Sequence, residues 1–284
     1  MYEQFYHLRE KPFSLTPDPA YLYMAKRHRH ALTMLEYALA EASGFALITG
    51  EVGCGKTTVV RHFLERIGRK VNVAFITNTH PGMGALLPWV VESLGLEPGQ
   101  LSPSELYRRF ANHAKAEYDD GQRIVLVIDE AQNLDVASLE ELRVLTNLNT
   151  GKQLLLQTIL IGQPELRDAL RLKSLRQFAQ RIVIDHHLEA LQLEETIGYV
   201  RHRIGVAGGR QELFTPDALA LVHECTGGVP RLVNILCDTA LVYGFGDQRA
   251  QIDLEIVEQV VHDRVGGVLP LAVTARTSST ALAG

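Results

Sequence analysis

The stretch GEVGCGKTT, residues 50–58, combines three glycines with a lysine and two threonines, directly after the apolar run FALIT. Glycines let backbone N–H groups turn inward without a Cβ clash, and with the start of a helix these groups form a concave anion site. In this spacing Lys56 would reach the β- and γ-phosphates of a nucleotide, and the Thr57 hydroxyl would bind Mg²⁺. The stretch therefore predicts a phosphate-binding loop, with a plain glycine-rich turn as the alternative. The predicted nucleotide-binding residues of the loop are Gly50, Glu51, Val52, Gly53, Cys54, Gly55, Lys56, Thr57 and Thr58.

A pair of acids, Asp129 and Glu130, ends the apolar run IVLVIDE. Carboxylates beside a buried strand are costly unless a cation or a reaction uses them. Asp129 suits the shell of the Mg²⁺ ion, and Glu130 suits a base that polarises the attacking water. Because side chains alternate along a strand, the turn after it must aim both acids at the phosphate. The alternative is that both acids cap the next helix.

The composition is that of a globular protein without a strong charge bias. The chain has 284 residues, an apolar fraction of 46% and a formal charge of −5, which disfavours bulk coating of nucleic acid but permits a local basic patch. Three cysteines without a CxxC pair, and an N-terminus without the layout of a signal peptide, predict a cytoplasmic protein. No apolar run approaches the roughly 18 residues of a membrane helix.

Apolar runs alternate with helical patterns in the first two thirds of the chain. Such alternation predicts βαβ units, and therefore a mostly parallel sheet with helices on both faces. The fold class that we expect is α/β, a P-loop NTPase sheet followed by an all-α lid domain. The expected strands are 45–50, 71–78, 123–130, 153–162 and 181–188.

The strand pattern stops near residue 191, and four amphipathic helices follow it. This change predicts a domain boundary. The expected parts are an N-terminal arm with the first helix of the core at 1–44, the ATPase core at 45–190, the helical lid at 191–265 and a flexible tail at 266–284.

The phosphate loop, the acids about 70 residues later and the helical domain together resemble the AAA+ ATPases. The resemblance implies roles for two further residues of the core. Asn78, which ends the second strand, is similar to the polar residue that holds the catalytic glutamate inactive until a partner binds. Gln163, after the fourth strand, takes the place of the family's sensor 1 residue, although Asn, Thr or Ser is more frequent there.

The same resemblance implies roles for three arginines. An arginine finger that enters a neighbouring subunit's site is expected just before the fifth strand, where LRQFAQRI contains Arg181, the first candidate, and Arg176, the second. A cation at the developing charge on the γ-phosphate strongly raises the rate. In GGVPRLVN, Arg231 resembles the sensor 2 arginine of the lid. For each arginine the alternative is an ordinary surface position.

Motifs in a fixed order along residues 1–265 resemble the ExeA/GspA-type secretion ATPase group. They are FYHLREKPFSLTPDPAYLY, GEVGCGKTT, DEAQNL, LIGQPEL, QRI and GGVPRLVN. In that group the N-terminal segment packs beside the adenine, which makes Pro17, Tyr21 and His30 candidate neighbours of the base. Members of the group usually extend into a membrane helix and a peptidoglycan-binding region, and neither is visible in this sequence.

The resemblance implies an ATPase that uses ATP and Mg²⁺ in a homo-oligomer, as a ring or helix of subunits. Its expected role is to drive assembly of an envelope secretion or export machine, in the cytoplasm or at the inner membrane through protein partners. The alternative is an ATP-dependent, DNA-binding transposition regulator of the TnsC/MuB/TniB type. A nucleotide-gated scaffold with little hydrolysis is a third reading, against which the intact Glu130 argues.

Overall fold

The computed structural model describes residues 1–264, apart from residues 17, 42, 43, 69, 78, 81 and 152. Predictions on Pro17, on Asn78 and on the tail at 266–284 lie outside the described residues. The described chain divides into two compact units. One unit is continuous, Lys26–Glu189, and the other combines residues 1–25 with the chain from residue 190 onward.

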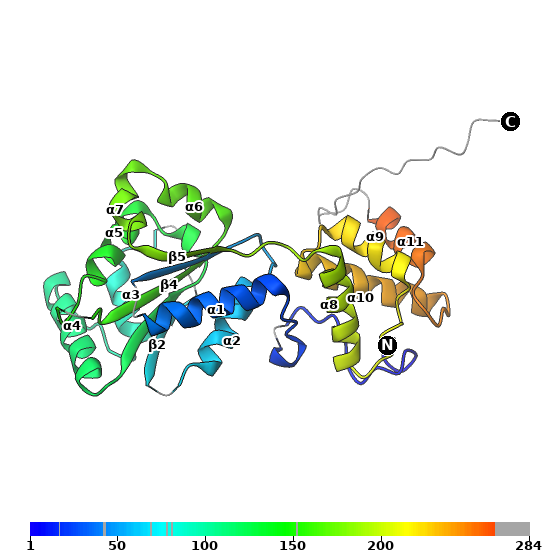
Figure 1. Cartoon of the computed structure of the whole chain (residues 1–284), viewed down its shortest axis with the longest axis horizontal. Helices are drawn as coiled ribbons and strands as arrows, with labels where there is room; N and C mark the ends of the chain where they lie inside the picture. The colour runs from blue at the N-terminus through cyan, green and yellow to red at the C-terminus, as the bar shows by residue number, and fades with distance from the viewer. Residues whose placement is uncertain are drawn as a thin grey trace. The chain divides into compact units, whose positions relative to one another are not determined.

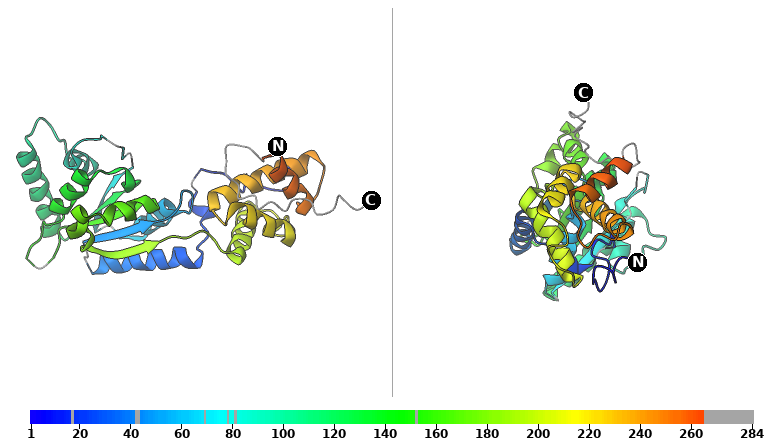
Figure 2. Two further views of the ribbon diagram at one scale, coloured as in Figure 1. Left: turned by 90° about the horizontal axis from the view of Figure 1, so that it is seen from above. Right: turned by 90° about the vertical axis from the view of Figure 1, so that its right-hand side faces the viewer.

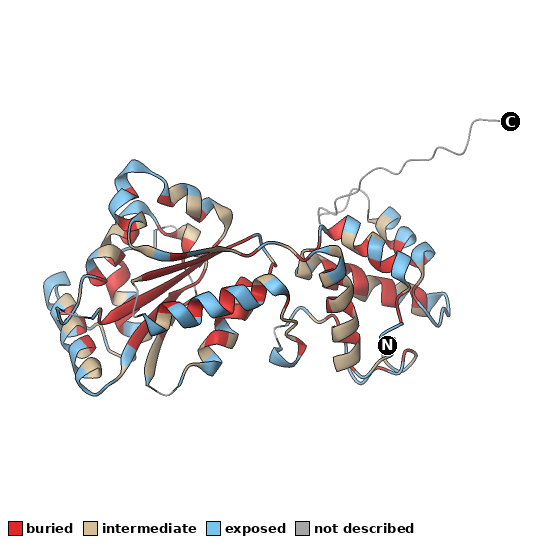
Figure 3. Ribbon diagram, viewed as in Figure 1, coloured by how far each residue is buried: buried red, intermediate tan, exposed pale blue. Residues whose placement is uncertain are grey.

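The first unit is built on a five-stranded sheet in which every pair of neighbours is parallel, in the order β2-β3-β4-β1-β5 (Figure 1). Near-continuous Val, Ile and Leu runs become strands here because both faces of the sheet are covered, and the strands are mostly buried (Figure 3). The strands are β1 (Phe45–Thr49), β2 (Val71–Ile76), β3 (Arg123–Ile128), β4 (Leu156–Gly162) and β5 (Ile182–His187).

Helices cover both faces of the sheet. α1 (Lys26–Ala40) contacts β1 and β5 and packs on α2 (Lys56–Arg66) (Figures 1 and 2). Apolar side chains from β1, β3 and β4 form a single core with five helices on the opposite face. These are α3 (Leu86–Ser93), α4 (Pro103–Asp119), α5 (Val136–Leu145), α6 (Pro164–Leu170) and α7 (Arg176–Ala179). The α/β class with helices on both faces is confirmed.

Two differences from the expected elements matter for the site. The third strand ends at Ile128, so the two acids lie in the turn after it rather than in the strand. The short helices α6 and α7 between β4 and β5 were not expected, because neither is long enough to show a helical period.

The second unit is helical and includes the N-terminal arm. Its helices are α8 (Leu193–Val206), α9 (Pro216–Thr226), α10 (Pro230–Gly246) and α11 (Leu254–Asp263). Phe5 packs edge-to-face on Phe245 with ring centroids 5.5 Å apart, and Phe13 does so on Phe214 at 6.1 Å. The aromatic residues of the arm therefore belong to the core of the helical unit.

Arg203 of α8 is the polar anchor of the arm. This buried guanidinium donates to the carbonyls of Pro12 at 2.5 Å and Ser14 at 3.2 Å, and to the Tyr199 hydroxyl at 3.1 Å. It also lies over the Tyr21 ring, 4.7 Å from the centroid. A buried cation of this kind is tolerated because each donor has a carbonyl, hydroxyl or aromatic partner.

We expect Arg203→Ala to lower the free energy of unfolding by about 2–4 kcal/mol, because buried carbonyls lose their donor and a cavity remains. Urea denaturation of the full chain measures the loss, and limited proteolysis should show earlier cleavage within residues 1–25. The matched control is Arg201→Ala on the same helix, which should change stability by less than about 0.5 kcal/mol. Equal effects of the two substitutions would contradict the anchoring role.

Candidate functional site

The phosphate loop runs from the end of β1 into the first turn of α2. Gly53 and Gly55 adopt positive φ angles of 83° and 91°, which side chains disfavour. Lys56, the first residue of α2, is buried, and its ammonium donates to the carbonyls of Gly50 at 2.7 Å and Glu51 at 2.9 Å. The lysine thus points into the concave side of the loop, as a phosphate ligand must.

Gly50 is required by packing rather than by its backbone angles. A Cβ atom at this position would lie 2.4 Å from the carbonyl oxygen of Leu188, well inside van der Waals contact. Leu188 follows β5, and its N–H donates to the carbonyl of Thr49 at 2.7 Å. The start of the loop is therefore pressed against the segment that leaves the last strand.

His28 of α1 supports the far side of the loop. Its Nε2 atom lies 3.1 Å from the carbonyl oxygen of Cys54, and a Cβ on Gly55 would come within 3.1 Å of the same nitrogen. Burial raises the pKa of the Cys54 thiol, so the cysteine stays protonated and serves as a small packed residue. The His28 contact thus holds the Cys54 carbonyl within the loop.

Two oxygen ligands face each other across the loop. The Thr57 hydroxyl donates to Oδ2 of Asp129 at 2.9 Å, and Asp129 is buried. The other carboxylate oxygen, Oδ1, accepts the backbone N–H of Glu130 at 2.9 Å. Because Mg²⁺ takes oxygen ligands and keeps several waters, one hydroxyl and one carboxylate beside a phosphate cradle suit it.

The backbone of Glu130 lets its side chain and that of Asp129 point to the same side, although neighbouring side chains in a strand alternate. Its φ angle of 52° is left-handed, which is uncommon for a residue other than glycine and turns its side chain away from the strand alternation. Thr79, after β2, holds this turn, since its hydroxyl lies 2.9 Å and 2.8 Å from the carbonyls of Asp129 and Glu130.

Two glutamine amides hold the Glu130 carboxylate. Nε2 of Gln132 donates to Glu130 Oε2 at 2.5 Å, and Nε2 of Gln163 donates to the same oxygen at 3.3 Å. The backbone N–H of Gln163 in turn donates to Oε1 of Gln132 at 3.1 Å. Residues from the ends of β1, β3 and β4 thus meet at one edge of the sheet.

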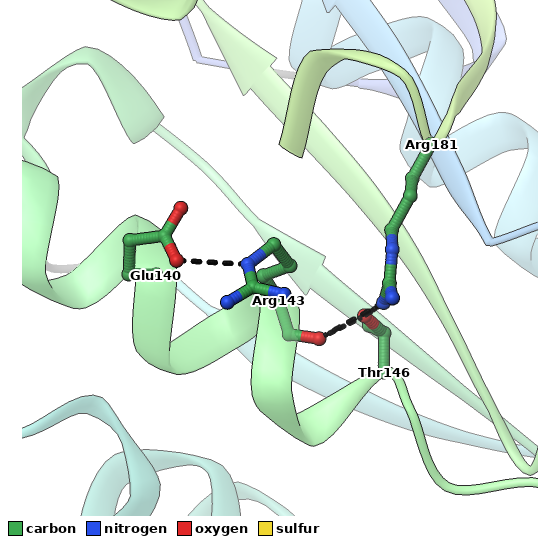
Figure 4. Close-up of polar contacts among 4 residues, drawn as sticks. All are labelled: Glu140, Arg143, Thr146 and Arg181. Atoms are coloured by element: carbon green, nitrogen blue, oxygen red, sulfur yellow. Dashed lines mark hydrogen bonds and ion pairs between the residues drawn. The ribbon is translucent and has the colours of Figure 1, made fainter. Parts of the chain in front are cut away.

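Arg181 and Arg176 differ in their surroundings. Arg181 donates through Nη1 to the carbonyl of Arg143 at 3.1 Å and lies 3.5 Å from the Thr146 hydroxyl, both at the carboxyl end of α5 (Figure 4). A cation there complements the helix dipole. Arg176, at the start of α7, is exposed, and its side chain has no hydrogen bond or ion pair with any other described residue.

The remaining candidates lie in different surroundings. Arg231 is exposed in the first turn of α10, in the helical unit, and His30 is exposed on α1. Tyr21 is buried in the helical unit, where its hydroxyl donates to Glu10 at 2.9 Å, and burial, with that hydrogen bond, raises its pKa to about 12. Packing and the contact with the Arg203 guanidinium explain why Tyr21 is buried at this position. That Tyr21 contacts the adenine base of a nucleotide stays a prediction.

Three residues of the site were not assigned from the sequence. They are His28, Thr79 and Gln132. Gln132 stands in the DEAQNL motif, only two positions after Glu130, so its place in the sequence could have drawn attention. His28 and Thr79 reach the site only through the packing of α1 and β2, which residue spacing does not reveal.

Comparisons with known proteins bear on the fold and the family of the chain. A family model described as an AAA domain matches residues 40–170, which contain β1 to β4 and the site residues that follow them. General secretion pathway protein A of Aeromonas hydrophila is 45% identical over 246 residues, covering 86% of this chain and 45% of that protein. The chain therefore spans less than half the length of this relative.

Solved structures share the fold at low sequence identity. The Aeropyrum pernix ORC2 protein, in ADPNP–ADP complexes, has a TM-score of 0.67 at 18% identity, covering 92% of this chain and 72% of that one. The Aeropyrum pernix ORC1 protein in complex with DNA has a TM-score of 0.62 at 19% identity, covering 89% and 69%. The phosphate loop lies within the matched domain, and the sequence relative extends the likeness over most of the chain. Residues 40–170 of the chain therefore form an AAA ATPase domain, and most of the chain is similar to general secretion pathway protein A.

Proposed function

We propose that the chain binds ATP with Mg²⁺ and hydrolyses its γ-phosphate in an assembly of like subunits, to drive the building of an envelope secretion or export machine. The observation that carries the catalytic part is the meeting of Lys56, Asp129, Glu130 and Gln163 at the carboxyl edge of a parallel sheet. In open parallel sheets, ligands bind at this edge, where the strand order changes direction.

Each residue has one task in the proposed reaction. The N–H groups of the loop and Lys56, which leaves the carbonyls of Gly50 and Glu51, bind the phosphates. Thr57 and Asp129 hold Mg²⁺, which supplies charge neutralisation on the phosphate oxygens. Glu130 accepts a proton from the attacking water, and the Gln163 amide turns to the γ-phosphate or to that water.

For the cation supplied by a neighbouring subunit, we propose Arg176 ahead of Arg181. Arg181 already caps α5 of its own subunit, and entering another site would break that cap. Arg176 is exposed and loses no described contact by extending outward. From the sequence alone, Arg181 is the first candidate and Arg176 the second, and this proposal reverses that ranking. The accessibility of the Arg176 guanidinium supports the change.

The secretion process is proposed from the 45% identity to general secretion pathway protein A. We propose that the chain works on the cytoplasmic side of an envelope, at the inner membrane through protein partners. None of the helices within the described residues is both long and apolar enough to cross a membrane. Arg231 and His30 are proposed to contact the nucleotide, as their resemblance to family positions implies.

Lys56→Ala should lower the rate of ATP hydrolysis about 100-fold or more, because the phosphates lose their main cation. Phosphate release at saturating ATP measures the loss. Lys115→Ala, which changes an exposed lysine on α4, is the matched control and should hydrolyse at the wild-type rate. Normal hydrolysis by the Lys56 variant would refute the proposed site.

Arg176→Ala should lower hydrolysis at least about 100-fold while leaving the unfolding midpoint unchanged, since a finger residue acts on the transition state in another subunit. Mixing this variant with Lys56→Ala should restore activity, because each supplies what the other lacks. Arg181→Ala should instead lower the unfolding midpoint. Loss of activity with Arg181→Ala alone, at unchanged stability, would return the role to Arg181.

Sedimentation with and without duplex DNA separates secretion from transposition. We expect neither ATP-dependent filaments on DNA nor a change in hydrolysis at low salt, where phosphate contacts are strongest. Filaments that need both ATP and DNA would overturn the secretion proposal in favour of the DNA-binding alternative.

A further inference from the structure

We propose that Gln132 is a positioning residue for Glu130, fixing the carboxylate so that one oxygen is anchored and the other faces the attacking water. The inference rests on the proposed ATPase function and adds a residue to it. It starts from three contacts that join Gln163, the residue after β4, and Gln132 to the catalytic acid.

The orientation of the Gln132 amide is fixed by its surroundings. Oε1 of Gln132 accepts the backbone N–H of Gln163 at 3.1 Å, so the oxygen cannot exchange places with the NH₂ group without setting donor against donor. The NH₂ group must then face Glu130, where it donates to Oε2 at 2.5 Å. Gln132 thus presents a donor to Glu130, and Oε2 of the glutamate accepts it.

The two amides on Glu130 have different anchors. The Gln163 amide is the more distant donor, at 3.3 Å, and its side chain is free to turn when a γ-phosphate arrives. Gln132 is the closer donor, and it is held by a backbone N–H at the start of α6, which does not turn with a side chain. Gln132 therefore keeps Glu130 in place while Gln163 changes partners.

The hydrogen-bond pattern leaves one oxygen for the reaction. Both amides donate to Oε2, and among the described residues no donor reaches Oε1 of Glu130. A base needs one acceptor oxygen within hydrogen-bond reach of the water proton, in a fixed direction. The left-handed backbone of Glu130 and the Gln132 amide together determine that direction.

Close packing limits the alternatives open to Gln132. A Cβ atom added to Gly162, the last residue of β4, would lie 3.2 Å from Gln132 Oε1 and 2.6 Å from a Leu166 methyl group. Glycine at this position makes room for the amide bridge. The small residue, the backbone donor and the carboxylate thus form one arrangement around Gln132.

The test substitutes Gln132→Met, which keeps the length of the side chain and removes the amide. We expect kcat to fall about 10- to 100-fold, because a misplaced base loses its alignment with the water. The dissociation constant of a fluorescent ATP analogue and the unfolding midpoint should stay at wild-type values. Gln100→Ala, an exposed glutamine of the same unit, is the matched control and should leave kcat unchanged.

A double-mutant cycle separates positioning from direct action. In a Glu130→Gln background, Gln132→Met should change the residual rate less than twofold, because its effect passes through the glutamate. Equal fold losses in both backgrounds would overturn the inference, as would a Gln132→Met enzyme with wild-type kcat. A parallel loss of nucleotide affinity and stability would also overturn it, since that pattern marks a structural residue.

Gln132→Glu supplies an independent signature. A second carboxylate beside Glu130 raises the pH at which the pair loses its first charge, so the acidic limb of the kcat–pH profile should move to higher pH. An unchanged limb would contradict contact between the two side chains in the working enzyme.

If wild-type and Lys56→Ala proteins hydrolyse equally, the ATPase proposal fails; if they differ and Gln132→Met is fully active, the inference about Gln132 fails alone.

Discussion

The alignment of parallel strands is the constraint on which the site depends. Thr49 of β1 is in register with Gly162 of β4, and Ile128 of β3 is in register with Leu160. Because neighbouring strands run the same way, the residues that follow them emerge at one edge. The phosphate loop, the two acids and Gln163 are brought together by this register alone, although they are far apart in the chain. A slip of one residue between two strands would shift the residues that follow one strand away from those that follow its neighbour.

The sequence predicted what depends on local pattern. Buried strands have apolar runs, and the phosphate loop has a fixed spacing of glycines and lysine, so β1 to β5 and Lys56 could be identified. The role of Gly50 could not, because the carbonyl of Leu188, which would lie 2.4 Å from a Cβ added to Gly50, belongs to a part of the chain more than a hundred residues away. The docking of the N-terminal arm on the helical unit, through Arg203, was hidden for the same reason.

Adjacent acids illustrate where pattern reasoning reaches its limit. Alternation along a strand predicts that Asp129 and Glu130 point to opposite faces. The strand ends two residues earlier than expected, and a left-handed Glu130, held by Thr79, re-aims the second carboxylate. Backbone strain of this kind persists only where surrounding contacts enforce it. The residue pair Asp-Glu does not by itself predict a strained backbone. The strain is recognised only in the structure, where Thr79 and Gln132 contact Glu130.

The charged groups of the site are held by neutral partners. Lys56 is bound by two carbonyls, Asp129 by a hydroxyl and a backbone N–H, and Glu130 by two amides. Among the described residues, none of the three takes part in an ion pair with an oppositely charged side chain. These neutral polar groups fix the position of each charged side chain without neutralising its charge, so the electric field of the side chain can still act on a ligand. A direct pair between Lys56 and either acid would satisfy both charges and would have to be broken before nucleotide could bind. In the structure, carbonyls take the hydrogen bonds of Lys56 and amides give theirs to Glu130, which is the electrostatic arrangement that suits the proposed binding of a nucleotide with its metal ion.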